Sequence, residues 1–119
     1  MFTAYVLVTG LAVAANAFSG IAALVHFKPI LPGMARAGVP VSWLTFPIGT
    51  LKTAGAAGLL LGLAAVPLIG TAAAIGLIAF FVCAVYTHIR ASDYSTQFGL
   101  AIAFGLLAVA ALTLHLAWA

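Results

Sequence analysis

Charged side chains are almost missing from this chain, which has four lysine or arginine residues and one acidic residue among 119. A soluble domain covers much of its surface with charged groups, so this composition excludes one. Hydrophobic residues make up 66% of the sequence, in continuous runs rather than alternating patterns. Within lipid only helices and closed barrels satisfy every backbone hydrogen bond, and continuous runs favour helices. The sequence therefore predicts an all-α integral membrane protein.

Cysteine is as scarce as charge, since the sequence contains Cys83 and no other. A single cysteine excludes an intrachain disulfide, a Cys-x-x-Cys dithiol and a cysteine cluster for zinc or iron–sulfur, and we expect no bound metal. The basic residues are separate and form no basic tract, so we expect no nucleic-acid partner. No basic segment precedes the first apolar run and no small-residue cleavage site follows it, so we expect a retained span rather than a signal peptide.

Proline and polar clusters divide the apolar sequence into four runs of membrane-spanning length. We expect spans at 3–25, 42–66, 68–90 and 96–118, within one transmembrane domain over 1–119. Pro67 is expected to break the second run, and the short links predict an antiparallel four-helix bundle with both termini on one side. Lys28, Arg36 and Arg90 flank one side only, so the positive-inside rule places loops 1–2 and 3–4 in the cytoplasm and both termini outside.

The second run carries one lysine, Lys52, among glycine, alanine and leucine residues. A charge inside a span is costly and usually faces a bundle interior or a water-filled cavity. Gly55 lies on the helical face of Lys52, and Gly58-x-x-x-Gly62 is a small-xxx-small pattern that lets another helix approach. We therefore expect Lys52 to point into the bundle; the alternative is a side chain that reaches the headgroups along an outer face.

Two further runs each show a stripe of residues at helical spacing, and in the first run the stripe is made of small and polar residues, which are typical of a buried face in a membrane. In the first run this face consists of Thr9, Ala12, Asn16, Gly20 and Ala23. In the third run it consists of Gly76, Phe80, Cys83 and Thr87. We expect Cys83 to be a small core residue. Asn16 lies near mid-membrane, where interhelical hydrogen bonding is the simpler reading and ligand binding is the alternative.

The segments between the runs predict how the helices begin. Residues 34–40 are expected to form a short helix in the membrane interface. Ser42 is a candidate N-cap of the second span, in which Pro47 is tolerable within the first turns. Ser92 or Asp93 is the candidate cap of the fourth span.

The topology brings most polar side chains into the half of the bundle nearest loops 1–2 and 3–4. The candidate acid/base residues are Lys52, Asp93 and His88. The candidate ligand-binding residues are Asn16, His26 and Arg90. His115, at the far end of the fourth span, is expected to be an interfacial residue without a chemical role. The partner of the only acid stays open between Lys52, in a buried pair that matters for stability, and Arg90, in a weak surface pair.

Three segments in order resemble the DoxX-like family of small membrane proteins. They are Met34-Ala-x-Ala-Gly-Val-Pro40, Gly49-x-x-Lys52-x-x-Gly55-x-x-Gly58-Leu-Leu and Thr87-His88-x-Arg90-Ala-x-Asp93. The resemblance covers nearly the whole chain and implies a four-helix membrane bundle. The family takes its name from a subunit of a thiosulfate:quinone oxidoreductase, and relatives are associated with membrane redox complexes or with the assembly of other membrane proteins. We accordingly expect an integral protein of a bacterial cytoplasmic membrane.

Three functions remain open at this point. The resemblance implies an accessory subunit of a membrane redox system in contact with a quinone; His26 and His88 facing each other would be needed for haem. The residues themselves also permit an intramembrane acid/base enzyme that isomerises, or opens an epoxide in, a lipid-like substrate. The third function is structural, in a larger complex or a homo-oligomer within the lipid. A narrow apolar cavity ending at Lys52 would favour the enzyme.

Overall fold

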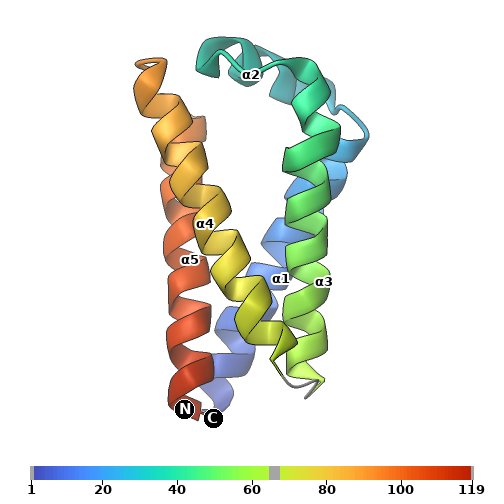
Figure 1. Ribbon diagram of the computed structural model, residues 1–119, viewed down its shortest axis with the longest axis vertical. Helices are drawn as coiled ribbons and strands as arrows, with labels where there is room; N and C mark the ends of the chain where they lie inside the picture. Colours follow the sequence, from blue (N-terminus) through green and yellow to red (C-terminus); the bar gives the residue numbers. More distant parts are fainter. Residues whose placement is uncertain (1, 65–67, 119) are drawn as a thin grey trace.

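The computed structural model describes residues 2–64 and 68–118, and its main elements are helices that run alternately up and down (Figure 1). The four long helices are α1 (Phe2–Leu24), α3 (Thr50–Leu63), α4 (Ile69–Arg90) and α5 (Thr96–Trp118). The first, third and fourth of these, and the segment Val41–Leu63, are long and apolar enough to cross a membrane. The two termini lie at the same end of the bundle (Figure 1). The predicted all-α membrane bundle with four spans is confirmed.

The buried face of α1 is the stripe of small and polar residues that the sequence predicts. Its buried residues are Tyr5, Thr9, Ala12, Asn16, Gly20 and Ala23. This face packs against α3 and α5. Small side chains permit the close approach of helices that stabilises a bundle in lipid, where burial from water contributes nothing.

The glycines of α3 let it approach α4 closely at the end where these two helices are connected. A Cβ added at Gly58 would lie 2.6 Å from the Cβ of Ala73, and one added at Gly62 would lie 2.7 Å from the Cα of Gly70. Towards the opposite end, the two helices diverge (Figure 1). The small-xxx-small pattern therefore closes only one half of the α3–α4 seam.

A short helix, α2 (Leu31–Ala37), lies across the end where α3 and α4 diverge (Figure 1). It ends at Gly38, whose φ of +70° is left-handed and is readily adopted by glycine. Its buried residues, which include Met34, face the bundle, where Met34 packs with Ala23 and Leu44. The short helix predicted at 34–40 is present, and it begins three residues earlier.

The second span does not begin as the sequence predicts. Ser42 makes no capping hydrogen bond, and it lies in a 3-10 turn, Val41–Leu44. A π-helical turn follows at Thr45–Gly49, within which Phe46 is extended at φ −144° and ψ 132°. Proline disfavours the helical conformation in the residue before it, so Pro47 delays the regular helix until Thr50. The expected end of this span at 66 and the break at Pro67 lie outside the described residues.

The buried face of α4 also differs from the predicted one. Its buried residues are Gly70, Ala74, Leu77 and Phe81. Leu77 and Phe81 each lie one position after a residue of the expected stripe, Gly76 and Phe80. Cys83 is exposed and is not a core residue. The reason is the divergence of α3 and α4, which leaves the predicted stripe facing an open space rather than a packed neighbour.

Candidate functional site

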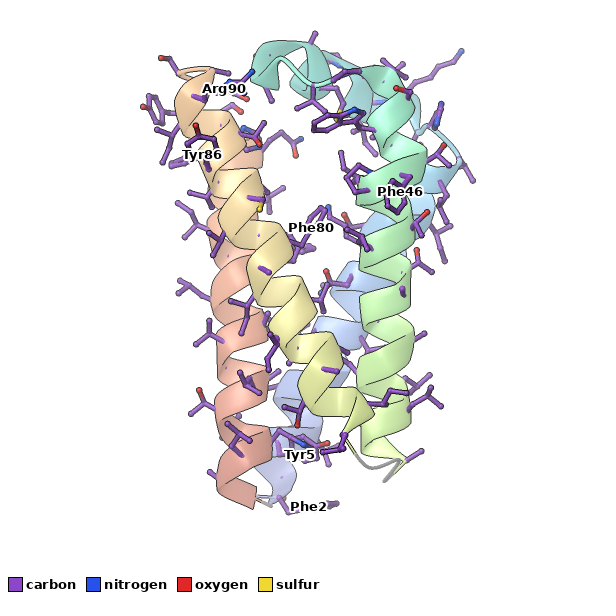
Figure 2. The ribbon with its side chains drawn as sticks, in the orientation of Figure 1. Phe2, Tyr5, Phe46, Phe80, Tyr86 and Arg90 are labelled. Atoms are coloured by element: carbon purple, nitrogen blue, oxygen red, sulfur yellow. The ribbon has the colours of Figure 1, made fainter. Side chains whose placement is uncertain are left out.

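A cavity of about 490 Å³ fills the space between the diverging helices and beneath α2. Its walls come from all five α-helices and from the segment before α3, and most of the lining residues are apolar. Phe80 extends from α4 into this space (Figure 2). The volume lies in the range that holds a drug-sized organic molecule, and an apolar wall with few polar groups is typical of ligand sites.

Lys52 brings the only lysine or arginine side chain to the lining, and it enters from the first turn of α3. Its Nζ donates a hydrogen bond to Ser19 Oγ of α1 at 2.8 Å. The rings of Phe80, Phe81 and Phe104 surround the ammonium, with centroids at 5.7, 5.6 and 5.7 Å from Nζ. Aromatic faces attract a cation within about 6 Å, and they do so more strongly when water is excluded. The prediction that Lys52 points into the bundle is confirmed.

The contact between Lys52 and Ser19 depends on the close approach of α1 to α3. A Cβ added at Gly20 would lie 2.5 Å from Thr53 Oγ1, 2.9 Å from the Thr53 backbone nitrogen and 3.1 Å from the Cβ of Lys52. The absence of a side chain at Gly20 therefore permits α1 and α3 to approach closely enough for Ser19 to reach the ammonium of Lys52.

His88 is a further polar group in the lining of the cavity, and Asp93 holds it in place. His88 Nδ1 lies 3.0 Å from Asp93 Oδ2, and the two side chains are 13% and 5% exposed. Because an ionised carboxylate only accepts hydrogen bonds, Nδ1 carries the proton and donates it. The other ring nitrogen, Nε2, has no hydrogen-bond partner among the described residues, and His88 lines the cavity. This is the arrangement in which a carboxylate orients an imidazole for proton transfer.

Asp93 sits in the link between α4 and α5, where its carboxylate accepts from two sides. Oδ1 accepts the Ser95 backbone N–H at 3.3 Å, while Oδ2 accepts from His88. Hydrogen bonding by Ser95, and then by His88, lowers the pKa of the Asp93 carboxyl, although partial desolvation opposes the shift. Asp93 thus pairs with neither of the partners considered from the sequence, Lys52 and Arg90.

We expect acid to destabilise the parent protein more than an Asp93→Asn variant. A carboxyl whose folded-state pKa is lowered contributes stability above its unfolded pKa, which is about 4 for aspartate. That contribution is lost as the pH falls through the lower folded-state pKa. Melting temperatures in detergent between pH 6 and pH 3 measure this difference in acid sensitivity between the two proteins. The chain has no other acidic side chain that would add to it. Equal acid dependence in the two proteins would contradict the His88–Asp93 pair.

The three residues expected to bind ligand do not line the cavity. Asn16 is fully buried, donates from Nδ2 to the Ala12 carbonyl at 2.9 Å, and leaves Oδ1 without a partner among the described residues. His26 is exposed and lies 3.1 Å from Thr45 Oγ1, so it does not face His88 across the bundle. Arg90 is exposed at the end of α4 (Figure 2).

His115 lies in the opposite half of the bundle, and it is more enclosed than expected. Its Nδ1 lies 3.4 Å from the hydroxyl of Tyr5, which is itself buried. The same hydroxyl donates to the Gly62 carbonyl at 3.5 Å. His115 therefore links α5 to α1 rather than standing free at an interface.

Several residues of the cavity cannot be singled out from sequence patterns. Ser19 lies beside the predicted stripe of α1, and its polarity within an apolar run was the available signal. Phe81 and Phe104 look like ordinary apolar residues of their runs, and only the packing of α4 against α5 brings their rings to Lys52. Among the described residues, there is no group of three or more His, Cys, Asp or Glu side chains that could hold a metal ion.

One of three comparisons with known proteins identifies a family for this chain. A sequence model described as the DoxX-like family matches residues 7–111. That range includes the whole lining of the cavity, from Ser19 to Phe104, and the Asp93 that holds His88. The search of curated proteins and the search of solved structures found no match.

Proposed function

The chain belongs to the DoxX-like family, and we propose that this member is an intramembrane enzyme that transfers a proton within an apolar, lipid-like substrate. One observation carries the proposal. An apolar cavity of about 490 Å³ contains Lys52 and His88, and His88 is held by the only acid of the chain. A buried pocket with a few polar groups is the usual form of an active site.

Lys52 is suited to hold an oxygen atom of the substrate. One of its three N–H groups is used by Ser19, and the surrounding rings accept no conventional hydrogen bond. The remaining donors would meet a carbonyl, epoxide or carboxylate oxygen. In an apolar site, a fixed cation stabilises negative charge that develops on such an oxygen more than it would in water.

His88 is suited to move the proton. With Nδ1 donating to Asp93, the free Nε2 would accept a proton from a carbon of the substrate, and the imidazolium formed would be stabilised by the carboxylate. Asp93 acts through His88, so it is a positioning residue.

Two reaction types balance without a co-reactant. In an isomerisation, Nε2 would take a proton from a carbon next to a carbonyl, the electron pair would move toward the oxygen held by Lys52, and the proton would return at another carbon. In an epoxide opening, the proton would leave a neighbouring carbon as the C–O bond breaks, and His88 would return it to the alkoxide. Both reactions need only Lys52 and His88 from the lining of the cavity.

The test is to identify the bound molecule and then follow proton exchange. Protein purified in mild detergent is extracted with organic solvent, and mass spectrometry compares the parent with a Lys52→Met variant. The recovered molecule is then incubated with protein in heavy water. We expect the parent to place deuterium on carbon, and a His88→Gln variant to lose this exchange by about 100-fold or more, the usual contribution of a general base.

The matched control is His26→Gln, which makes the same substitution at an exposed histidine outside the cavity. It is expected to exchange deuterium at the parent rate. A bound molecule that neither gains carbon-bound deuterium nor has an epoxide opened by the parent protein would contradict an acid/base enzyme. Co-purification of other protein subunits without any small molecule would instead support a structural or assembly role.

A second candidate is an accessory redox role with a quinone in the same cavity. The rings of Phe80, Phe81 and Phe104 offer apolar faces to a planar headgroup, and Lys52 offers a donor for a quinone carbonyl oxygen. His88 Nε2 would accept a hydrogen bond from a hydroxyl of the reduced quinol. A quinone in the solvent extract, with no exchange on carbon, would favour this role over the enzyme.

We also propose that the end of the bundle covered by α2 faces the cytoplasm. The basic residues Lys28, Arg36 and Arg90 support this orientation under the positive-inside rule. Labelling of cysteines introduced into the loop that contains Lys28 tests it in intact cells.

A further inference from the structure

The positive charge at Lys52 has no counter-ion within the described chain. Asp93 is the only acidic residue in the sequence, and its carboxylate is bound to His88 and Ser95. No acidic side chain lines the cavity. Ser19 contributes a neutral hydroxyl, and the aromatic rings contribute only a partial attraction. A desolvated cation without a counter-ion raises the free energy of the protein. We therefore expect a molecule that occupies the site to carry a negative charge.

The cavity opens sideways, between α3 and α4. Its lining includes exposed residues on both of these helices, namely Leu51 on α3 and Gly76, Ala79 and Cys83 on α4. The two helices diverge towards the end covered by α2 (Figure 1). Ala79 lies at the middle of the 22-residue helix α4, so this mouth faces the hydrocarbon region in a bundle that crosses a membrane. Gly33, Met34 and Ala37 of α2 cover the end of the cavity nearest the aqueous side. A ligand dissolved in the bilayer therefore reaches the cavity more directly than a ligand from the aqueous side, which would have to pass α2.

We propose that the molecule bound here is a single-chain amphiphile with a carboxylate head, which enters from the bilayer between α3 and α4. Its carboxylate accepts hydrogen bonds from Lys52, and its apolar chain leaves the cavity through the mouth beside Gly76. The identification rests on the proposed function, for which it names the substrate class. The cavity has the size of a drug-sized molecule, which suits one chain rather than a two-chain phospholipid.

Matched long-chain probes test the charge of the head. Binding of tritium-labelled palmitate to purified protein is measured in detergent, and unlabelled palmitate and hexadecanol compete for it. The two competitors have the same chain, and only palmitate carries a negative charge. We expect hexadecanol to compete at least about tenfold more weakly with the parent, because a charge-assisted hydrogen bond is lost. In the Lys52→Met variant, we expect the residual affinities to become equal, whereas Lys28→Met, on an exposed loop residue, keeps the parent preference.

A variant that blocks the mouth tests the route. A Cβ added at Gly76 meets nothing within 4 Å, so a Gly76→Trp side chain has room to start, and we expect its indole to block the mouth. We expect it to weaken palmitate binding by about tenfold or more while the melting temperature without ligand is unchanged. Gly10→Trp is the matched control, since Gly10 also has nothing within 4 Å and does not line the cavity.

Failure of this inference can be told apart from failure of the proposed function. Equal competition by hexadecanol and palmitate with the parent would overturn the carboxylate head, while a bound molecule in the extract would still support the cavity as a binding site. Full palmitate binding by Gly76→Trp would overturn the lateral route. If neither probe binds and the extract holds no small molecule, both the inference and the proposed function are wrong.

Discussion

A Lys52→Met variant is expected to fold as well as the parent and to lose the molecule that the parent retains. The substitution removes a desolvated cation without a counter-ion, and such replacements by packed apolar groups are often neutral or stabilising. Methionine has similar length, and its sulfur packs favourably against rings such as those of Phe80, Phe81 and Phe104. Ser19 keeps a partner within reach, because a helical serine can donate to a carbonyl of its own preceding turn.

The expected loss of affinity follows from the hydrogen bond that Lys52 would make. Hydrogen bonds to charged groups contribute about 1.5–3 kcal/mol, which corresponds to roughly 10- to 150-fold in the dissociation constant. Melting curves in detergent measure the thermal stability of the variant, and mass spectrometry of the solvent extract measures how much of the bound molecule it retains. The control is Lys28→Met, the same change at an exposed residue. A variant that melts at least as high as the parent but retains the same amount of the molecule would show that Lys52 does not hold it.

A Gly62→Val variant is expected to destabilise the bundle by about 2–3 kcal/mol, towards the upper end of the usual cost of overpacking. Position 62 faces the backbone of α4, since an added Cβ would lie 2.7 Å from the Cα of Gly70 and 3.3 Å from its nitrogen. A backbone cannot rotate away as a side chain does, so α3 and α4 must separate. Because this contact closes the half of the seam opposite the cavity, the separation would also widen the cavity.

Thermal melting in detergent measures the effect of Gly62→Val. Gly10→Val is the matched control, because it places the same side chain on α1 at a position where an added Cβ has nothing within 4 Å. We expect the control to melt close to the parent temperature. Equal melting temperatures for the two variants would contradict the close packing of α3 on α4. A further readout is palmitate affinity, which should fall in Gly62→Val and stay unchanged in Gly10→Val.

The sequence by itself determined the membrane class, the four spans and the buried face of α1. Lipid leaves an apolar chain few alternatives, because every backbone group must be bonded within a helix or a closed barrel. Helices approach closely in lipid where their residues are small, so a stripe such as Thr9, Ala12 and Gly20 marks a packed face without knowledge of its neighbour. The inward direction of Lys52 followed from the same reasoning, since a cation avoids hydrocarbon.

Only the tertiary structure decided what Lys52 meets and where the cavity lies. The sequence offered Asp93 as its partner because opposite charges attract, but the carboxylate lies in the link before α5 and is closer to His88, which ends α4. Pro47 shifts the start of α3 to Thr50, and the glycines of α3 close its seam with α4 at one end only. The opening at the other end turns the stripe of Phe80 and Cys83 from a core face into a cavity wall. Such an outcome depends on the angle between two helices, which is set by the packing of all their side chains together and cannot be read from the spacing within either one.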